Sequence, residues 1–214
     1  MNKLLFSAIS KKFVMALAGL FLLVFLPVHL IINLLLLNDD PAQFNNAAHF
    51  MATFPPVKVV EILLFLTIVV HISYGIIIQT QNWLTRPVRY AVRNKSETTA
   101  FSRFMIWTGG SVLVFMVIHF FNFYFMKLGW VEGNPEDFYS VAHNLFAIPG
   151  YVVFYWVCFI ILGLHLYHAL QSAFQTLGLK NDFWAPVIRV LALIYSIVLP
   201  LGFASIPLFI WLIK

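Results

Sequence analysis

Four histidines lie inside long apolar stretches of this sequence, and these are the residues best suited to do chemistry. They are His29 in LPVHLIIN, His71 in IVVHISYG, His119 in FMVIHFFN and His165 in LGLHLYHA. An ionisable ring inside a membrane is costly, so such residues usually serve a function. Imidazole is also the commonest metal ligand in proteins. One histidine in each of the first four apolar stretches therefore suggests a metal cofactor held between helices.

The composition indicates that nearly the whole chain lies in a lipid bilayer. Of its 214 residues, 62% are hydrophobic and 10% are charged, and the mean hydropathy is +0.90. A soluble domain carries roughly 25% charged residues. The net charge of +5 comes from basic residues beside the apolar stretches, so it indicates topology and not nucleic-acid binding. The single cysteine, Cys158, excludes an internal disulfide, and no CxxCH motif for covalent haem attachment is present.

We expect five membrane-spanning helices, because five apolar stretches reach the length of about 20 residues that a bilayer-crossing helix needs. The predicted spans are about 13–37, 57–80, 104–126, 148–176 and 187–213, and they form a single all-α membrane domain over residues 1–214. The first stretch follows a signal-like charged start. Its apolar part is too long for a signal peptide and contains His29, so we expect it to be retained.

Basic residues gather on one side of the predicted spans. They are Lys3, Lys11, Lys12, Arg86, Arg89, Arg93, Lys95, Arg103 and Lys180. The connections on the other side carry the acidic residues Asp39, Asp40, Glu132, Glu136 and Asp137. Cytoplasmic loops of membrane proteins are enriched in lysine and arginine. The sequence therefore predicts a cytoplasmic N-terminus and a C-terminus, at Lys214, on the outside.

The depth of each histidine follows from the helical rise of about 1.5 Å per residue. His29 and His119 lie about 24 Å above the inner ends of their spans, which run outward. His71 and His165 lie about 21 Å and 25 Å below the outer ends of theirs, which run inward. The rings therefore sort into an outer pair, His29 with His119, and an inner pair, His71 with His165. The two levels are separated by roughly 15 Å in a core about 30 Å thick.

A weak internal repeat supports this pairing. Gly19 stands ten residues before His29, and Gly109 stands ten residues before His119. Small residues allow a neighbouring helix or a flat macrocycle to come close. Spans 1–2 and 3–4 therefore resemble two copies of one hairpin. Further matched positions are Asn33 and Asn122 after the outer histidines, and Gly75 and Ala169 after the inner ones.

Two imidazoles at each level match the axial ligands of haem iron in a helical bundle. A structural zinc ion usually takes four ligands of the Cys/His kind, which neither level offers. Two non-covalent b-type haems are therefore the preferred interpretation. The alternative at each position is a histidine that only hydrogen-bonds to a neighbouring helix.

The sequence also resembles a known family, the diheme cytochrome b subunits of succinate:quinone oxidoreductases. These belong to succinate dehydrogenase or menaquinol:fumarate reductase, respiratory complex II. The segments AQFNNAAHFMATFPP, VVEILLFLTIVVHISYG and HLYHALQSAFQTLG carry the resemblance, which covers essentially the whole chain. It implies a distal, outer haem ligated by His29 and His119 and a proximal, inner haem ligated by His71 and His165. It also favours His165 over the nearby His168 as the ligand.

The resemblance implies a membrane anchor that transfers electrons but does not itself oxidise succinate or reduce fumarate. A flavoprotein subunit and an iron–sulfur subunit would dock on its cytoplasmic face. Electrons would pass between the iron–sulfur subunit, the two haems and a membrane quinone, expected to be menaquinone. The chain has no Gly-rich nucleotide loop and no cysteine cluster of its own. The expected location is the inner membrane of a bacterium, and nucleic acid is not an expected partner.

Polar residues near the two levels are further candidates for the site. At the inner level, haem propionates could be contacted by His168, Lys11, Lys12, Arg103, Gln171 and Gln175. For the cations among them the alternative is a residue that snorkels to the membrane surface. At the outer level, His49 and Glu61 could serve a quinone. Their alternatives are a solvated loop histidine and a helix-capping glutamate.

Two other functional classes remain open from the sequence. One is the diheme anchor of another quinone-linked oxidoreductase, such as a nitrate reductase or a hydrogenase, although those families place their histidines on fewer helices. The other is a haem-free transporter or channel in which the histidines form a proton path. The physiological direction, succinate oxidation or fumarate reduction, is not fixed by any residue.

Overall fold

Five helical segments of the protein are long and apolar enough to cross a membrane, which confirms the predicted fold class. The computed structural model describes residues 8–84 and 104–213, and all the regular structure in these two ranges is helical. The spans are Ile9–Leu37, Pro55–Leu84, Met105–Lys127, Pro149–Thr176 and Trp184–Leu212. The largest differences from the expected bounds are at Ile9 and Leu84, where the helices extend beyond the predicted 13 and 80.

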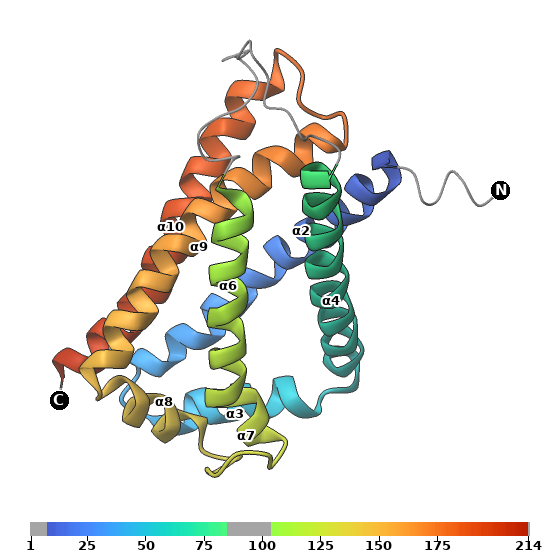
Figure 1. Ribbon diagram of the computed structural model, residues 1–214. Helices are drawn as coiled ribbons and strands as arrows, with labels where there is room; N and C mark the ends of the chain where they lie inside the picture. Colours follow the sequence, from blue (N-terminus) through green and yellow to red (C-terminus); the bar gives the residue numbers. More distant parts are fainter. Residues whose placement is uncertain (1–7, 85–103, 214) are drawn as a thin grey trace.

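Some spans contain more than one helical element. The first joins α2 (Ala8–Asn33) to the 3₁₀ helix η1 (Leu34–Leu37), and the second is α4 (Pro55–Leu84). The third joins α6 (Met105–His119), the π-helix η2 (Phe120–Tyr124) and α7 (Phe125–Lys127). The last two are α9 (Pro149–Thr176) and α10 (Trp184–Leu212). Consecutive spans run in opposite directions, so α2 begins at one end of the bundle and α10 finishes at the other (Figure 1).

Two short helices that the sequence did not predict lie together at one end of the bundle (Figure 1). They are α3 (Pro41–Thr53) and α8 (Phe138–Phe146), in the stretches that the sequence indicates as acidic connections between spans. We call this end the outer end, after the predicted orientation. The helices α3 and α8 together form what we call the end platform.

Each platform helix begins with a capping aspartate. Asp40 accepts a hydrogen bond from the N–H of Ala42 at 3.0 Å, and Asp137 accepts one from the N–H of Ser140 at 3.1 Å. The Ser140 hydroxyl, the Asn45 amide and the Ser140 N–H hold the pKa of Asp137 below its ordinary value. The aspartate therefore stays ionised, and able to cap the helix, to a lower pH than an ordinary aspartate.

Asn45 joins the two platform helices. Its amide nitrogen donates to Asp137 Oδ1 at 2.9 Å, and its oxygen accepts from the N–H of Tyr139 at 3.0 Å. The Tyr139 hydroxyl donates to the carbonyl of Asn38 at 3.0 Å. These bonds satisfy polar groups that lie at the edge of the apolar core, so the platform closes the outer end as one unit.

The buried part of the chain is centred on α9, which packs against α10 and α2 (Figure 1). About a third of its apolar window, 33%, is buried inside the chain, against 6% for the second and third spans. Thr67 is the buried residue of α4, and α6 has none. The second and third spans therefore need lipid, a cofactor or another subunit to cover most of their apolar surface.

The two most buried spans, α9 and α10, approach closely at Gly163. Pro200 of α10 has no N–H, so the carbonyl of Ser196 loses its usual intrahelical donor. A Cβ added at Gly163 would lie 2.7 Å from that carbonyl oxygen and 3.3 Å from Pro200 Cγ. Only a glycine fits this approach without a shift of one backbone against the other.

Gly163→Ala is expected to destabilise the chain, because the new methyl group would press on backbone and not on a flexible side chain. Overpacking of this kind costs about 1–3 kcal/mol. Thermal unfolding in detergent would measure the loss. The matched control is Gly150→Ala near the start of α9, where an added Cβ meets no atom within 4 Å. Equal stability of the two variants would contradict the close approach.

Candidate functional site

His29 of α2 and His119 of α6 lie next to each other, as the depth argument predicted for the outer pair. Their ring centres are 5.9 Å apart, and the ring planes meet at 89°. Both side chains are half-buried. Aromatic rings surround the pair: Phe25, Phe203, Phe115 and Phe123. The structure therefore brings together two imidazoles from helices that are far apart in the sequence, in apolar surroundings.

The polar contacts of the outer pair are made at the Nδ1 atoms. The amide nitrogen of Asn33 donates to the carbonyl of His29 at 2.7 Å and lies 3.4 Å from His29 Nδ1. The hydroxyl of Tyr155, a residue with 2% of its surface exposed, lies 3.5 Å from His119 Nδ1 and accepts from Asn122 at 3.0 Å. In the described ranges, neither Nε2 atom has a hydrogen-bond partner.

The predicted inner pair, His71 of α4 and His165 of α9, lies in similar surroundings in the two hairpins. Each ring edge packs against a glycine of the preceding span. A Cβ added at Gly19 would lie 3.4 Å from His71 Cε1, and one at Gly109 would lie 3.3 Å from His165 Cε1. The equivalent glycines of the two predicted hairpins therefore make equivalent contacts, which agrees with the internal repeat.

The two inner histidines differ in their Nδ1 partners. The Thr108 hydroxyl lies 3.2 Å from His165 Nδ1. His71 Nδ1, in contrast, is the buried side-chain polar atom that lacks a hydrogen-bond partner among the described residues. Its ring lies near the backbone of Met15, without a bond of good geometry. An unpaired polar atom in an apolar interior is costly, so this asymmetry needs an explanation.

The other inner candidates are dispersed at the inner ends of α2 and α9. His168 is half-buried and follows His165 by three residues on α9. The Gln171 side chain donates to the carbonyl of Tyr167 at 3.2 Å, on its own helix. Lys11 is half-buried, and Lys12 and Gln175 are exposed. Arg103 lies outside the described residues.

At the outer end, Glu61 is held by a cluster of polar side chains. Its carboxylate pairs with Lys58 at 3.0 Å and Lys127 at 3.4 Å, and it accepts from the Tyr124 hydroxyl at 3.1 Å. The cluster ties the start of α4 to the outer end of the third span, so Glu61 does more than cap a helix. His49 is exposed on α3 and is not among these partners.

The polar residues that the sequence reasoning missed include Thr108, Tyr155 and His143, besides the partners of Glu61. The ring of His143 stacks on Tyr139 with centres 4.0 Å apart, and its Nε2 lies 3.2 Å from the carbonyl of Leu36. It therefore fastens α8 to η1 and has a structural role. A comparison of the two hairpins residue by residue would have singled out Thr108, whereas Tyr155 and His143 carry no such signal.

Within residues 8–84 and 104–213, no three or more His, Cys, Asp or Glu side chains converge to hold a metal ion. A zinc site needs three or four protein ligands, so the two histidine pairs do not suit it. A centre in which a macrocycle supplies the remaining ligands needs only two imidazoles. Each predicted histidine pair offers two imidazoles, which is the number that such a centre needs.

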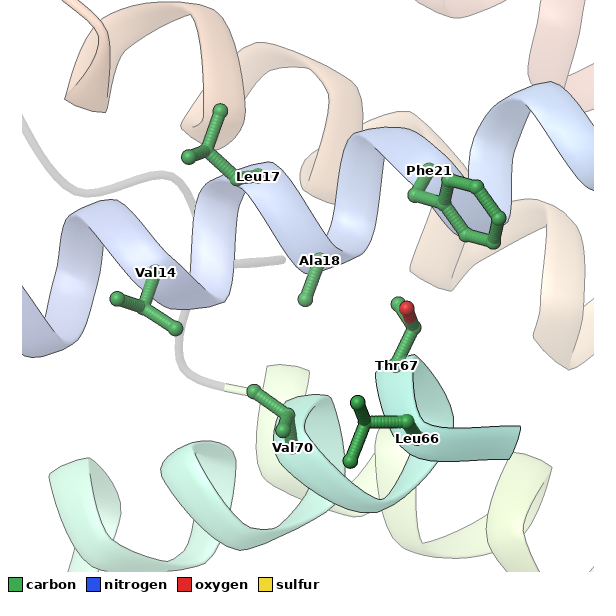
Figure 2. A pocket seen from close by; sticks show the side chains of 7 residues that line it. All are labelled: Val14, Leu17, Ala18, Phe21, Leu66, Thr67 and Val70. Carbon is green, nitrogen blue, oxygen red and sulfur yellow. The ribbon is translucent and has the colours of Figure 1, made fainter. Parts of the chain in front are cut away.

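A groove of about 280 Å³ lies at the crossing of α2 and α4, close to His71 along α4. Figure 2 shows the side chains that line it, namely Val14, Leu17, Ala18, Phe21, Leu66, Thr67 and Val70. Thr67 provides the polar atom of this lining, and Ala18 lies across the groove from it (Figure 2). The groove is otherwise apolar.

Comparisons of the chain with protein-family models, with curated proteins and with solved structures found no match in any of the three.

Proposed function

We propose that the protein is a membrane anchor and electron-transfer subunit that carries two bis-histidine b haems. It would pass electrons between an iron–sulfur subunit and a membrane quinone in a succinate dehydrogenase or fumarate reductase complex. His29 and His119 would hold the outer haem, and His71 and His165 the inner one. The observation that carries the proposal is the close approach of His29 and His119, two histidines from different apolar spans whose ring centres are 5.9 Å apart.

The geometry of the outer pair suits a shared metal. Each metal–nitrogen bond is about 2 Å long, so two imidazoles that share a metal would lie close together. His29 and His119, with ring centres 5.9 Å apart, are near enough that they could hold one metal between them. For His29 Nε2 to bind, Asn33 must turn its amide oxygen toward Nδ1 or leave it. A bound haem would supply one-electron chemistry.

The chain's own residues would orient the imidazoles and exclude water from them. The aromatic rings around the outer pair keep it apolar, and burial of this kind tunes the potential of a haem. The poorly buried second and third spans leave surface that a macrocycle could cover. The apolar surroundings of the outer pair support the proposal over a proton path, because a proton path needs a chain of polar groups and water between the two levels.

The partners and the location belong to the same proposal. A flavoprotein and an iron–sulfur subunit would dock on the basic, cytoplasmic face, in the inner membrane of a bacterium. The quinone would be menaquinone. Of the two quinone candidates Glu61 is better supported, because its half-buried carboxylate lies in a span beside the Tyr124 phenol, whereas His49 is exposed.

A reduced-minus-oxidised absorption spectrum of the purified chain tests the proposal most directly. We expect a b-type signal and, from the haem content, about two haems per chain, because each histidine pair can supply two axial ligands. A colourless protein would contradict the proposal and favour a haem-free transporter. The same preparation should not oxidise succinate. Oxidation without partner subunits would contradict the role of an anchor.

A further inference from the structure

We propose that Thr108 is a positioning residue for His165, and that Ala18 occupies the equivalent position beside His71, where the hydroxyl is missing. The inner site would thus contain one imidazole, His165, whose Nδ1 forms a side-chain hydrogen bond, and one, His71, whose Nδ1 does not. The consequence for haem binding rests on the proposed function. The hydrogen bond itself can be tested without haem.

The hydrogen bonds of Thr108 determine which nitrogen of His165 carries the proton. The Thr108 hydroxyl donates its single proton to the carbonyl of Met105 at 3.0 Å. Its oxygen therefore faces His165 Nδ1, at 3.2 Å, as an acceptor. The proton of the neutral ring is then on Nδ1, and the lone pair of Nε2 is free. A metal-binding histidine needs this tautomer, and its orientation is usually fixed by such a bond at the other nitrogen.

The internal repeat shows what stands at the same place in the first hairpin. Residues 15–19 read MALAG and residues 105–109 read MIWTG, and each segment ends ten residues before a histidine of the outer pair. Gly19 and Gly109 pack on the two inner rings. In this register Met15 corresponds to Met105, and Ala18 corresponds to Thr108. The position whose hydroxyl contacts His165 is therefore occupied by a methyl group in the first hairpin.

This difference explains the unpaired Nδ1 of His71. The atom is buried without a partner, although its ring lies near the backbone of Met15, the counterpart of Met105. The space beside Ala18 is the groove between α2 and α4 (Figure 2). A hydroxyl added at Ala18 would take the place that corresponds to the Thr108 hydroxyl, from which it could accept the Nδ1 proton. The first hairpin thus has a main-chain segment that corresponds to the one around Thr108, but it lacks the hydroxyl.

The tautomer can be measured in the haem-free chain by ¹⁵N NMR of labelled histidine in detergent. For His165 we expect the Nδ1-protonated form in the original chain, in Thr108→Ser and in the control Ser111→Ala. Ser111 also bonds to a carbonyl of α6, at 3.0 Å, but it is exposed. Thr108→Val keeps the shape and removes the hydroxyl, so it should shift His165 toward a mixture of tautomers. An unchanged tautomer in Thr108→Val would overturn the proposal.

Haem retention provides the second measurement. Removing a bond that orients a metal ligand typically weakens binding by about 10–100-fold. Thr108→Val should therefore release the inner haem faster by that factor, raise its midpoint potential and leave the outer haem unchanged. Thr108→Ser should restore both properties. Equal release from Thr108→Val and the original chain would overturn the positioning role. A chain that binds no haem would instead overturn the proposed function, and the tautomer measurement would still decide the role of Thr108.

The missing hydroxyl leads to a gain-of-function test with a matched pair of variants. Ala18→Thr and Ala18→Val add side chains of the same shape, and only the first adds a hydroxyl. Ala18→Thr should retain the inner haem longer than Ala18→Val and give it a lower midpoint potential, because a held Nδ1 proton makes the imidazole a stronger ligand. Identical retention and potential in the two variants would refute the equivalence of Ala18 and Thr108.

Discussion

Under the proposed function, a chain carrying His29→Leu is expected to lose one haem completely and to keep the other. His29 and His119 are neighbours across α2 and α6, so removal of either ring would leave the proposed outer haem with one histidine to hold it. The inner pair comes from α4 and α9 and has separate contacts. Leucine at position 29 should not unfold the chain, because it places an apolar group in apolar surroundings. Haem content and a redox titration of the purified variant would measure the result.

The proposed pairing also predicts which haem each variant keeps. His29→Leu and His119→Leu should leave the same haem, with the same midpoint potential, and the double variant should resemble either single one. His71→Leu and His165→Leu should leave the other haem. The control is His49→Leu, which should keep both haems because that ring is exposed on α3. Loss of both haems from folded His29→Leu would contradict two separate levels.

The spans and the outer histidine pair could be predicted from the sequence, because both depend on short-range rules. A long apolar run determines a bilayer-crossing helix, and the fixed helical rise then converts sequence position into depth. The calculation placed His29 and His119 at the same height, and the structure brings their rings to 5.9 Å. It needed no knowledge of which helix packs against which.

The end platform and the details of the sites could not be predicted, because they depend on contacts between residues that are far apart in the sequence. The helices α3 and α8 are short and only moderately apolar, and they are joined through Asn45, which contacts residues more than ninety positions away. The π-helix η2 after His119 and the contact of Tyr155 with that ring also depend on the packing of neighbouring helices. A polar residue within a span gives no sign of which ring it will meet.

Gly19 and Gly109 show most clearly how packing changes the meaning of a pattern. By spacing they belong to the outer histidines, which they precede by ten residues. In the structure they contact the inner ones instead, because each faces the next span of its hairpin. Thus two glycines on the α2 and α6 helices, which bear the outer pair, provide room for the inner pair.

Gly109→Leu is expected to remove the inner haem and to leave the outer haem bound. A Cβ at this position already lies 3.3 Å from His165 Cε1, so the longer leucine side chain must displace the ring. The displaced His165 would also lose its contact with Thr108, and an imidazole that is misplaced by about 1 Å no longer positions its nitrogen for a metal. Gly19→Leu should have the same effect through His71. Haem content and the midpoint potential of the remaining haem would measure the result.

The adjacent glycine provides a matched control for this prediction. A Cβ at Gly110 meets no atom within 4 Å, and the position is exposed, so Gly110→Leu should keep both haems. Both substitutions on α6 replace glycine with a better helix former, so a difference between them reports the contact with His165 and not helix propensity. If Gly109→Leu lost the outer haem instead, the glycine would act through His119 on its own helix. The contacts between the two spans of each hairpin would then not support the inner pair.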